Sequence, residues 1–156
     1  MSDDTGACPK ENVSHGEHGV IKDAEFLARI VLREMVGEDR LLTKKALKME
    51  DFRNKDGWSF VRKDFAEMKV LLAQRANSRR RQLSDYGYAL VKTSDIRSML
   101  DDEKKREICV IDDPLPDSSE HALGQKSRPN ISKGDVDEIR KKLLELFQEV
   151  HYPWEQ

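Results

Sequence analysis

Several features that would assign a function at once are scarce or missing in this sequence of 156 residues. It has two cysteines, Cys8 and Cys109, without the number or spacing of a disulfide-bonded scaffold or a metal site. No apolar run approaches the roughly 18 residues of a membrane-spanning helix. Its few glycines are isolated, so there is no glycine-rich phosphate loop. We therefore expect no metal, no cofactor and no membrane association.

Neither sign of charge dominates the composition. The 28 basic and 30 acidic residues leave a formal net charge of -2, which excludes a polybasic role for the chain as a whole. Hydrophobic residues make up 37% of the chain and charged residues another 37%, with a mean hydropathy of -0.76. The apolar residues are clustered, so a chain of this length predicts one compact domain with tails.

The cysteines and the N-terminus bear on the cellular compartment. Cys109 lies in the apolar run 108–111, where burial raises the pKa of a thiol, so we expect an inert core thiol. The sequence begins without a basic segment followed by an apolar stretch, unlike a secretory signal peptide. These observations predict a reducing, cytoplasmic location.

Composition divides the chain into three parts. Residues 1–19 hold four acidic residues and three glycines and almost nothing large and apolar, which predicts a disordered acidic tail. Residues 20–150 carry the periodic apolar patterns of a single α+β domain. Residues 151–156 form an aromatic tail, which we expect either to fold back onto the domain or to present a docking motif to a partner.

The periodicity predicts a small mixed β-sheet with three to four helices packed on it. Apolar residues with helical spacing predict helices over 20–36, 64–82, 95–100 and 132–150. The segment 41–52 predicts a short helix, with a strand as the alternative. Short apolar runs predict strands over 58–61, 88–91 and 108–111, and the last two could pair in parallel. Residues 112–131, with three prolines, predict a long irregular loop.

The final helix carries the clearest pattern. Ser132 stands at its N-cap position, with Asp135 three residues later. Its apolar stripe consists of Val136, Ile139, Leu143, Leu146, Phe147 and Val150. Such a stripe must be buried, either on the sheet of the same chain or on a second copy. The sequence thus predicts a monomer or a homodimer.

A cluster of arginines is the most specific electrostatic feature. It comprises Arg75, Arg79, Arg80 and Arg81, a local charge of +4 without an acidic residue between 75 and 82. Guanidinium groups bind phosphates and carboxylates in a bidentate manner, so the cluster can bind an anionic ligand or a protein partner. Two structural alternatives are cations at a helix C-terminus and ion pairs with the acidic stretch 112–120.

A second group of residues resembles catalytic machinery. His121 can act as a general base, Asp112 or Asp113 can orient it, Arg62 can hold a phosphate and Ser59 can hydrogen-bond to it. The alternative is that Asp112 and Asp113 form a turn before Pro114. No nucleophile elbow or dinucleotide-binding fingerprint accompanies these residues.

These observations favour a small binding or accessory module that uses a charged surface to contact a protein partner or an anionic ligand. Nucleic-acid binding through the arginine cluster is one alternative. An enzyme acting on a nucleotide or another phosphorylated substrate, with His121 as general base, is the other. Together with the compact α+β pattern, the stretches 58–62 and 120–123 suggest a prokaryotic source.

Overall fold

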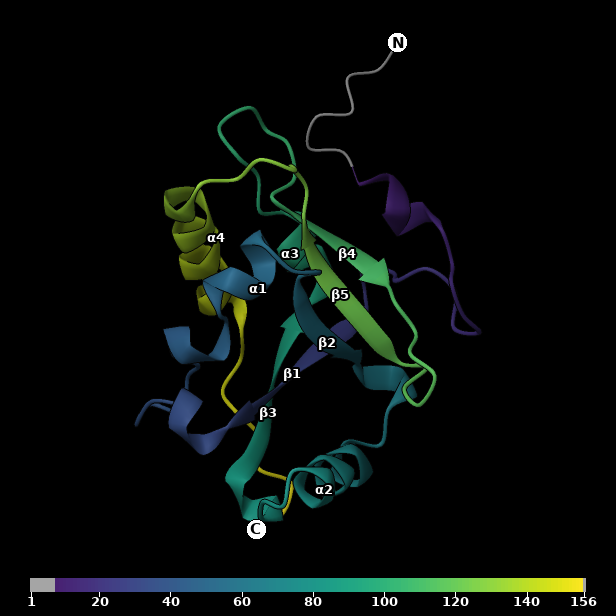
Figure 1. Ribbon diagram of the computed structural model, residues 1–156, viewed down its shortest axis with the longest axis vertical. Coiled ribbons are helices and arrows are strands. Elements are labelled where there is room, and N and C mark those ends of the chain that lie inside the picture. The colour runs from purple at the N-terminus through teal and green to yellow at the C-terminus, as the bar shows by residue number, and fades with distance from the viewer. Residues whose placement is uncertain (1–7, 156) are drawn as a thin grey trace.

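A five-stranded antiparallel sheet forms the centre of the protein, as described by a computed structural model for residues 8–155 (Figure 1). Its strands are β1 (Phe26–Leu32), β2 (Trp58–Arg62), β3 (Tyr86–Lys92), β4 (Ile108–Asp112) and β5 (His121–Lys126), in the order β3-β1-β2-β5-β4. The α+β class is confirmed, but every neighbouring pair is antiparallel. The parallel pairing considered for 88–91 and 108–111 is wrong, because β3 and β4 form opposite edges.

Helices cover both faces of the sheet. They are α1 (Met49–Arg53), α2 (Met68–Ser78), α3 (Thr93–Arg97) and α4 (Lys133–Leu146), joined by short 3-10 turns. The larger core packs the sheet against α1, α3 and α4 through residues such as Trp58, Phe60 and Ile139. The other face packs against α2, with Ala28, Val61 and Met68 buried between them. In Figure 1, α2 lies at the opposite end of the molecule from α4.

The helix predicted over 20–36 is wrong, because this segment forms β1. Leu27 and Val31 point into the core under α4, whereas Ala28 and Ile30 pack on the α2 side. A strand with both faces covered has no alternation of apolar and polar residues, so its apolar run can mimic a helical period.

The loop predicted over 112–131 contains β5, which lies between β2 and β4 inside the sheet. Gly124 sits opposite both Trp58 and Val110. A Cβ at this position would lie 2.8 Å from the ring of Phe60, so the packing requires a glycine here. Because of this glycine and the polar residues after it, β5 lacks the apolar pattern that predicts a strand.

The helix α4 ends four residues earlier than the predicted helix 132–150, but its apolar stripe is buried as expected. Phe147 continues in an extended conformation and stacks against Phe60. The backbone of 148–151 then bonds to Leu90 and Tyr88, and so covers the free edge of β3. Within the described part of 151–156, Tyr152 is buried, so this tail folds back onto the domain.

Two of the other predicted helices are shorter than expected. The segment 41–52 contains a 3-10 turn, Lys44–Ala46, and the start of α1. The helix predicted over 64–82 is α2, whose N-cap residue, Glu67, makes no side-chain capping hydrogen bond. Because α2 ends at Ser78, three of the four clustered arginines follow the helix.

Residues 8–20 form an N-terminal strap along the outer edge of β4, whereas we expected a disordered tail over 1–19. The Cys8 and Cys109 sulfurs form a disulfide, and Glu11, 7% exposed, accepts a hydrogen bond from the Val110 amide of β4. Residues 1–7 lie outside the described part. The prediction of unpaired cysteines is therefore wrong, and with it the argument for a reducing compartment loses its basis.

Among residues 8–155, no helix has the length and apolar character needed to cross a membrane.

The N-terminus of α4 offers a simple stability test. The Ser132 side chain accepts a hydrogen bond from the Asp135 amide at 3.1 Å, as the N-cap pattern predicts. Ser132→Ala should lower the free energy of unfolding by about 1 kcal/mol, measured by denaturant titration. Ser132→Thr retains the hydroxyl and should stay close to wild type. Equal stability of the alanine variant and wild type would contradict the capping role.

Candidate functional site

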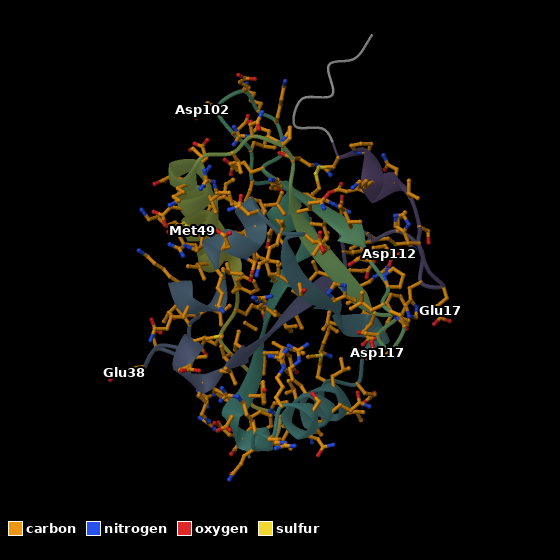
Figure 2. The ribbon with its side chains drawn as sticks, viewed as in Figure 1. Glu17, Glu38, Met49, Asp102, Asp112 and Asp117 are labelled. Atoms are coloured by element: carbon orange, nitrogen blue, oxygen red, sulfur yellow. A yellow bond between two sulfur atoms is a disulfide. The ribbon has the colours of Figure 1, made fainter. Side chains whose placement is uncertain are left out.

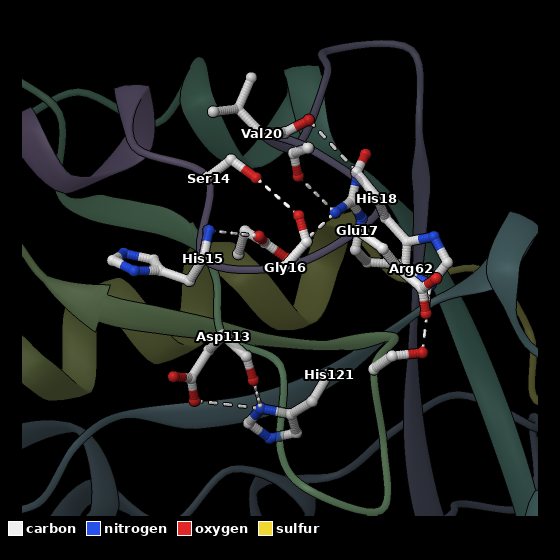
Figure 3. A network of polar contacts seen from close by, with 12 residues as sticks. Ser14, His15, Gly16, Glu17, His18, Val20, Arg62, Asp113 and His121 are labelled. Atoms are coloured by element: carbon white, nitrogen blue, oxygen red, sulfur yellow. Dashed lines mark hydrogen bonds and ion pairs between the residues drawn. The ribbon is translucent and has the colours of Figure 1, made fainter.

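Arg62, a candidate phosphate ligand, is instead a buried structural residue. Its side chain is 1% exposed and forms ion pairs with Glu25 at 2.7 Å and Asp112 at 3.1 Å. It also donates to the backbone carbonyls of the N-terminal strap at residues 18, 19 and 20 (Figure 3). A guanidinium has five N–H groups, and these contacts occupy all of them. The prediction that Arg62 holds a phosphate is therefore wrong.

The alternation of side chains along the strands also separates Arg62 from Ser59 and His121. Successive side chains of a strand point to opposite faces, so Arg62 shares the face of Trp58 and Phe60 under α4, whereas Ser59 shares the α2 face of Val61. His121 is paired with Val61 in the neighbouring strand and lies on the α2 face too. Asp112 is engaged by Arg62 and by the His15 amide. The predicted catalytic set is thus divided between the two faces of the sheet.

The α2 face contains a pocket of about 570 Å³, which we call the arginine pocket. It lies between α2, the middle of the sheet and the β4–β5 connection, whose residue Asp117 is labelled in Figure 2. Its polar lining includes Arg29, Ser59, Gln74, Arg75, Ser78, Arg79, Asp117, Ser118 and His121. Sites for small molecules have volumes of about 300–1,000 Å³, so this pocket has a suitable size.

Arg29 lies between β1 and β2 at the border of the pocket, although the alternation of side chains places it on the face of Leu27 and Val31. The strands β1 and β2 are paired only at Leu27–Arg62 and Ala28–Val61. Beyond this point the Arg29 side chain bridges them, donating to the carbonyl of Ser59 at 2.8 Å and twice to that of Ala46. Burial, partly offset by Asp51, and repulsion from Arg75 lower the pKa of Arg29 to about 10. Two of its five N–H groups remain for a ligand.

The arginine cluster is divided by the end of α2. Arg75 and Arg79 line the pocket, whereas Arg80, in a left-handed backbone conformation with φ 54°, and Arg81 do not. Removal from water and repulsion from Arg79 lower the pKa of Arg75. Within residues 8–155, no carboxylate forms an ion pair with any of the four cluster arginines, so the predicted pairing with 112–120 is absent there.

His121 lies at the opposite wall of the pocket and contacts one of its two predicted partners. Its Nδ1 is 3.1 Å from the Asp113 carboxylate and 2.9 Å from the Asp113 carbonyl (Figure 3). The structure therefore selects Asp113, and not Asp112, as the group that orients His121. Ser59 lines the same pocket, but no hydrogen bond joins it to His121 in the described part of the chain.

One group of potential metal ligands is present among the described residues, formed by Cys8, Glu11 and Cys109. The two sulfurs are bonded to each other, and the Glu11 carboxylate is paired with Arg97 and Arg106. Two guanidinium cations beside the carboxylate repel a metal ion, so these residues do not fit one in the oxidised protein.

No protein-family model, curated protein or solved structure matches this chain. The candidate site is therefore defined by its geometry and charge alone. It consists of three guanidinium groups, one free carboxylate at Asp117, and a histidine oriented by Asp113. Such a set can bind a ligand with negatively charged oxygens through charge-assisted hydrogen bonds.

Arg29 is the site residue that sequence patterns do not reveal. It stands in an apolar segment, 46 residues before Arg75, and the next basic residue along the chain is Arg33, directly after β1. An arginine inside an apolar strand is a signal of a buried partner or ligand, because a buried guanidinium requires compensation.

Proposed function

We propose that the protein is a binding module for a small anionic ligand, such as one carrying a phosphate or a carboxylate group, and that the arginine pocket is its site. One observation carries this proposal: Arg29, Arg75 and Arg79 all line one pocket, whereas Asp117 is the single carboxylate in its lining. Burial lowers the pKa of Arg29 and of Arg75, and repulsion from Arg75 and from Arg79, respectively, adds to this effect; a bound oxyanion would offset that repulsion.

The placement of the arginines favours a small ligand over a protein or nucleic-acid partner. Arg75 and Arg79 line a concave site together with Arg29, rather than a row along an exposed face. Only Arg80 and Arg81 remain outside it for phosphate contacts along a strand, and few such contacts give weak binding. Nucleic-acid binding and a protein partner stay predictions, and so does the choice between monomer and homodimer.

The cellular location also remains a prediction. The cytoplasmic location favoured by the sequence has one argument against it, since disulfides such as Cys8–Cys109 persist mainly in oxidising compartments.

The proposal predicts that substitution of the pocket arginines weakens anion binding more than substitution of the neighbouring arginines outside the pocket. The wild-type protein should bind sulfate and inorganic phosphate, observed as shifts of the arginine Nε–H resonances in an NMR titration. Arg75→Gln combined with Arg79→Gln should weaken binding by roughly 100-fold or more, because each removes a charged hydrogen-bond donor worth about 1.5–3 kcal/mol. The folded structure should persist, because the double variant relieves repulsion in the pocket.

Arg80→Gln combined with Arg81→Gln is the matched control, with the same change in net charge at the same end of α2. At physiological salt it should bind these ions within a few-fold of wild type, because Arg80 and Arg81 do not line the pocket and salt screens charges outside it. Equal weakening by both double variants would indicate a diffuse electrostatic effect. Absence of binding by the wild type would refute the proposal, and binding of an oligonucleotide alone would favour the nucleic-acid alternative.

A further inference from the structure

We infer that anion binding in the arginine pocket is linked to protonation of His121. When a fully deprotonated oxyanion binds, His121 takes up a proton at Nε2. The inference rests on the proposed function and adds the ligand class, namely oxyanions that only accept hydrogen bonds. It follows from the hydrogen bonds of His121, its position in the pocket and the charges around it.

The first step is the tautomer of His121. Its Nδ1 lies 2.9 Å from the backbone carbonyl oxygen of Asp113 and 3.1 Å from the carboxylate of the same residue. A carbonyl oxygen can only accept a hydrogen bond, so Nδ1 carries the hydrogen. A neutral imidazole has one N–H group, which leaves an unprotonated Nε2 with a lone pair.

The second step is the position of Nε2. In Figure 3 the second ring nitrogen points away from Asp113. Within residues 8–155 it has no hydrogen-bond partner, although the side chain is only 13% exposed and lines the arginine pocket. The neutral ring therefore offers a hydrogen-bond acceptor to the pocket. The arginines favour ligands that are themselves acceptors, and such a ligand cannot bond to the neutral Nε2. A deprotonated oxyanion can bond to Nε2 only when this nitrogen also carries a hydrogen.

The third step is the balance of charge around the ring. On the β4–β5 connection, the carboxylates of Asp113 and Asp117 place negative charge on the same side of the pocket as His121. Arg29 on β1 and the pair Arg75 and Arg79 at the end of α2 place positive charge in the rest of the lining. A bound dianion offsets the charge of the arginines and adds an acceptor for Nε2–H. Binding therefore raises the proton affinity of His121, and by reciprocity protonation of His121 strengthens binding.

Sulfate is a suitable probe because its oxygens carry no proton near neutral pH. We expect saturating sulfate to raise the pKa of His121, followed through its ring C–H resonances by NMR, by about one unit or more. Between the pKa values of His121 in the free and in the sulfate-bound protein, the affinity for sulfate should fall with rising pH, in total about tenfold for a shift of one unit. Measurements between pH 6 and about 8.5 keep Arg29, whose pKa is about 10, protonated.

Two variants separate this inference from the proposed function. His121→Gln should still bind sulfate through the arginines, but with an affinity independent of pH over this range. His15→Gln is the control, because the His15 ring is exposed and the hydrogen bond of this residue to Asp112 comes from its backbone amide. Its affinity should keep the wild-type pH dependence.

The outcomes are distinct. Sulfate binding with an unchanged pKa of His121, or an equal pH dependence in His121→Gln, would overturn the inference and leave the anion site intact. Absence of sulfate binding at every pH would overturn the proposed function and this inference with it. A pH dependence lost in His15→Gln as well would assign the proton to another group and so overturn the inference.

Discussion

Arg62→Met should lower the free energy of unfolding by about 3–5 kcal/mol, the usual effect of removing one partner of a buried ion pair. The variant leaves the carboxylates of Glu25 and Asp112 without their cation, at 8% and 2% exposure. It also removes the donors to the carbonyls of residues 18, 19 and 20, which hold the N-terminal strap. Denaturant titration of both proteins measures the difference.

Removing the charged partners of Arg62 distinguishes the contribution of charge from that of packing at this site. With Glu25→Gln and Asp112→Asn already present, Arg62→Met should cost less than in the wild-type background, because fewer uncompensated charges remain. Lys69→Met, on the exposed side of α2, is the control and should change stability by no more than about 0.5 kcal/mol. A difference below about 1 kcal/mol for Arg62→Met would contradict the buried cluster.

Acid should weaken the same cluster. Burial raises the pKa of Glu25, but hydrogen bonds from Arg62 and the Lys22 amide, with the charge of Arg62, outweigh it and leave the pKa below its ordinary value. A carboxyl with a lowered folded-state pKa contributes stability that is complete above the unfolded-state pKa, about 4.3 for glutamate. This contribution disappears as the pH falls through the folded-state pKa. Arg62→Met should lose this part of the acid dependence.

The disulfide is the second large contribution to stability. It joins Cys8 to Cys109 across a sequence separation of 101 residues. Because a long closed loop restricts the unfolded chain strongly, Cys8→Ser should lower the free energy of unfolding by about 2–5 kcal/mol. Amide hydrogen exchange should also become faster in the N-terminal strap, since Cys8 anchors its first residues to β4.

Reduction provides the control for this substitution. Dithiothreitol should lower the stability of the wild-type protein to about that of Cys8→Ser and leave the variant unchanged. A thiol assay on the unfolded, unreduced wild type should detect no reactive cysteine. Wild-type stability that is the same with and without reductant would show that the disulfide adds nothing to the folded state.

Much of the fold can be predicted where one face of an element is polar. The N-cap at Ser132 and the stripe of α4 agree with the structure because this helix has one buried face and one solvated face. The strand at 108–111 was found through its short apolar run. In contrast, the apolar pattern of β1 resembles that of a helix, because helices cover both faces of this strand. The pattern of β5 does not indicate a strand, because its centre is Gly124, a glycine required by the close contact with Phe60.

The candidate site divides in the same way. Arg75 and Arg79 could be named from the sequence, because four arginines without an acidic neighbour form a local signal. His121 could be named together with Asp112 or Asp113, because all three follow the predicted strand 108–111, but the choice of Asp113 came from the structure. Arg29 could not, since its role depends on the separation of β1 from β2. Arg62 was misassigned because strand parity, which requires the correct sheet, places it on the opposite face from His121.

By itself, the sequence determined the α+β class, the buried stripe of α4 and the local concentration of arginines, because each depends on residues close together in the chain. Only the tertiary structure decided that Cys8 meets Cys109, that Arg62 is enclosed by Glu25 and Asp112, and that Arg29 joins the arginine pocket. These contacts link residues dozens of positions apart. The order and direction of the strands bring them together, and no periodicity along the chain encodes that order.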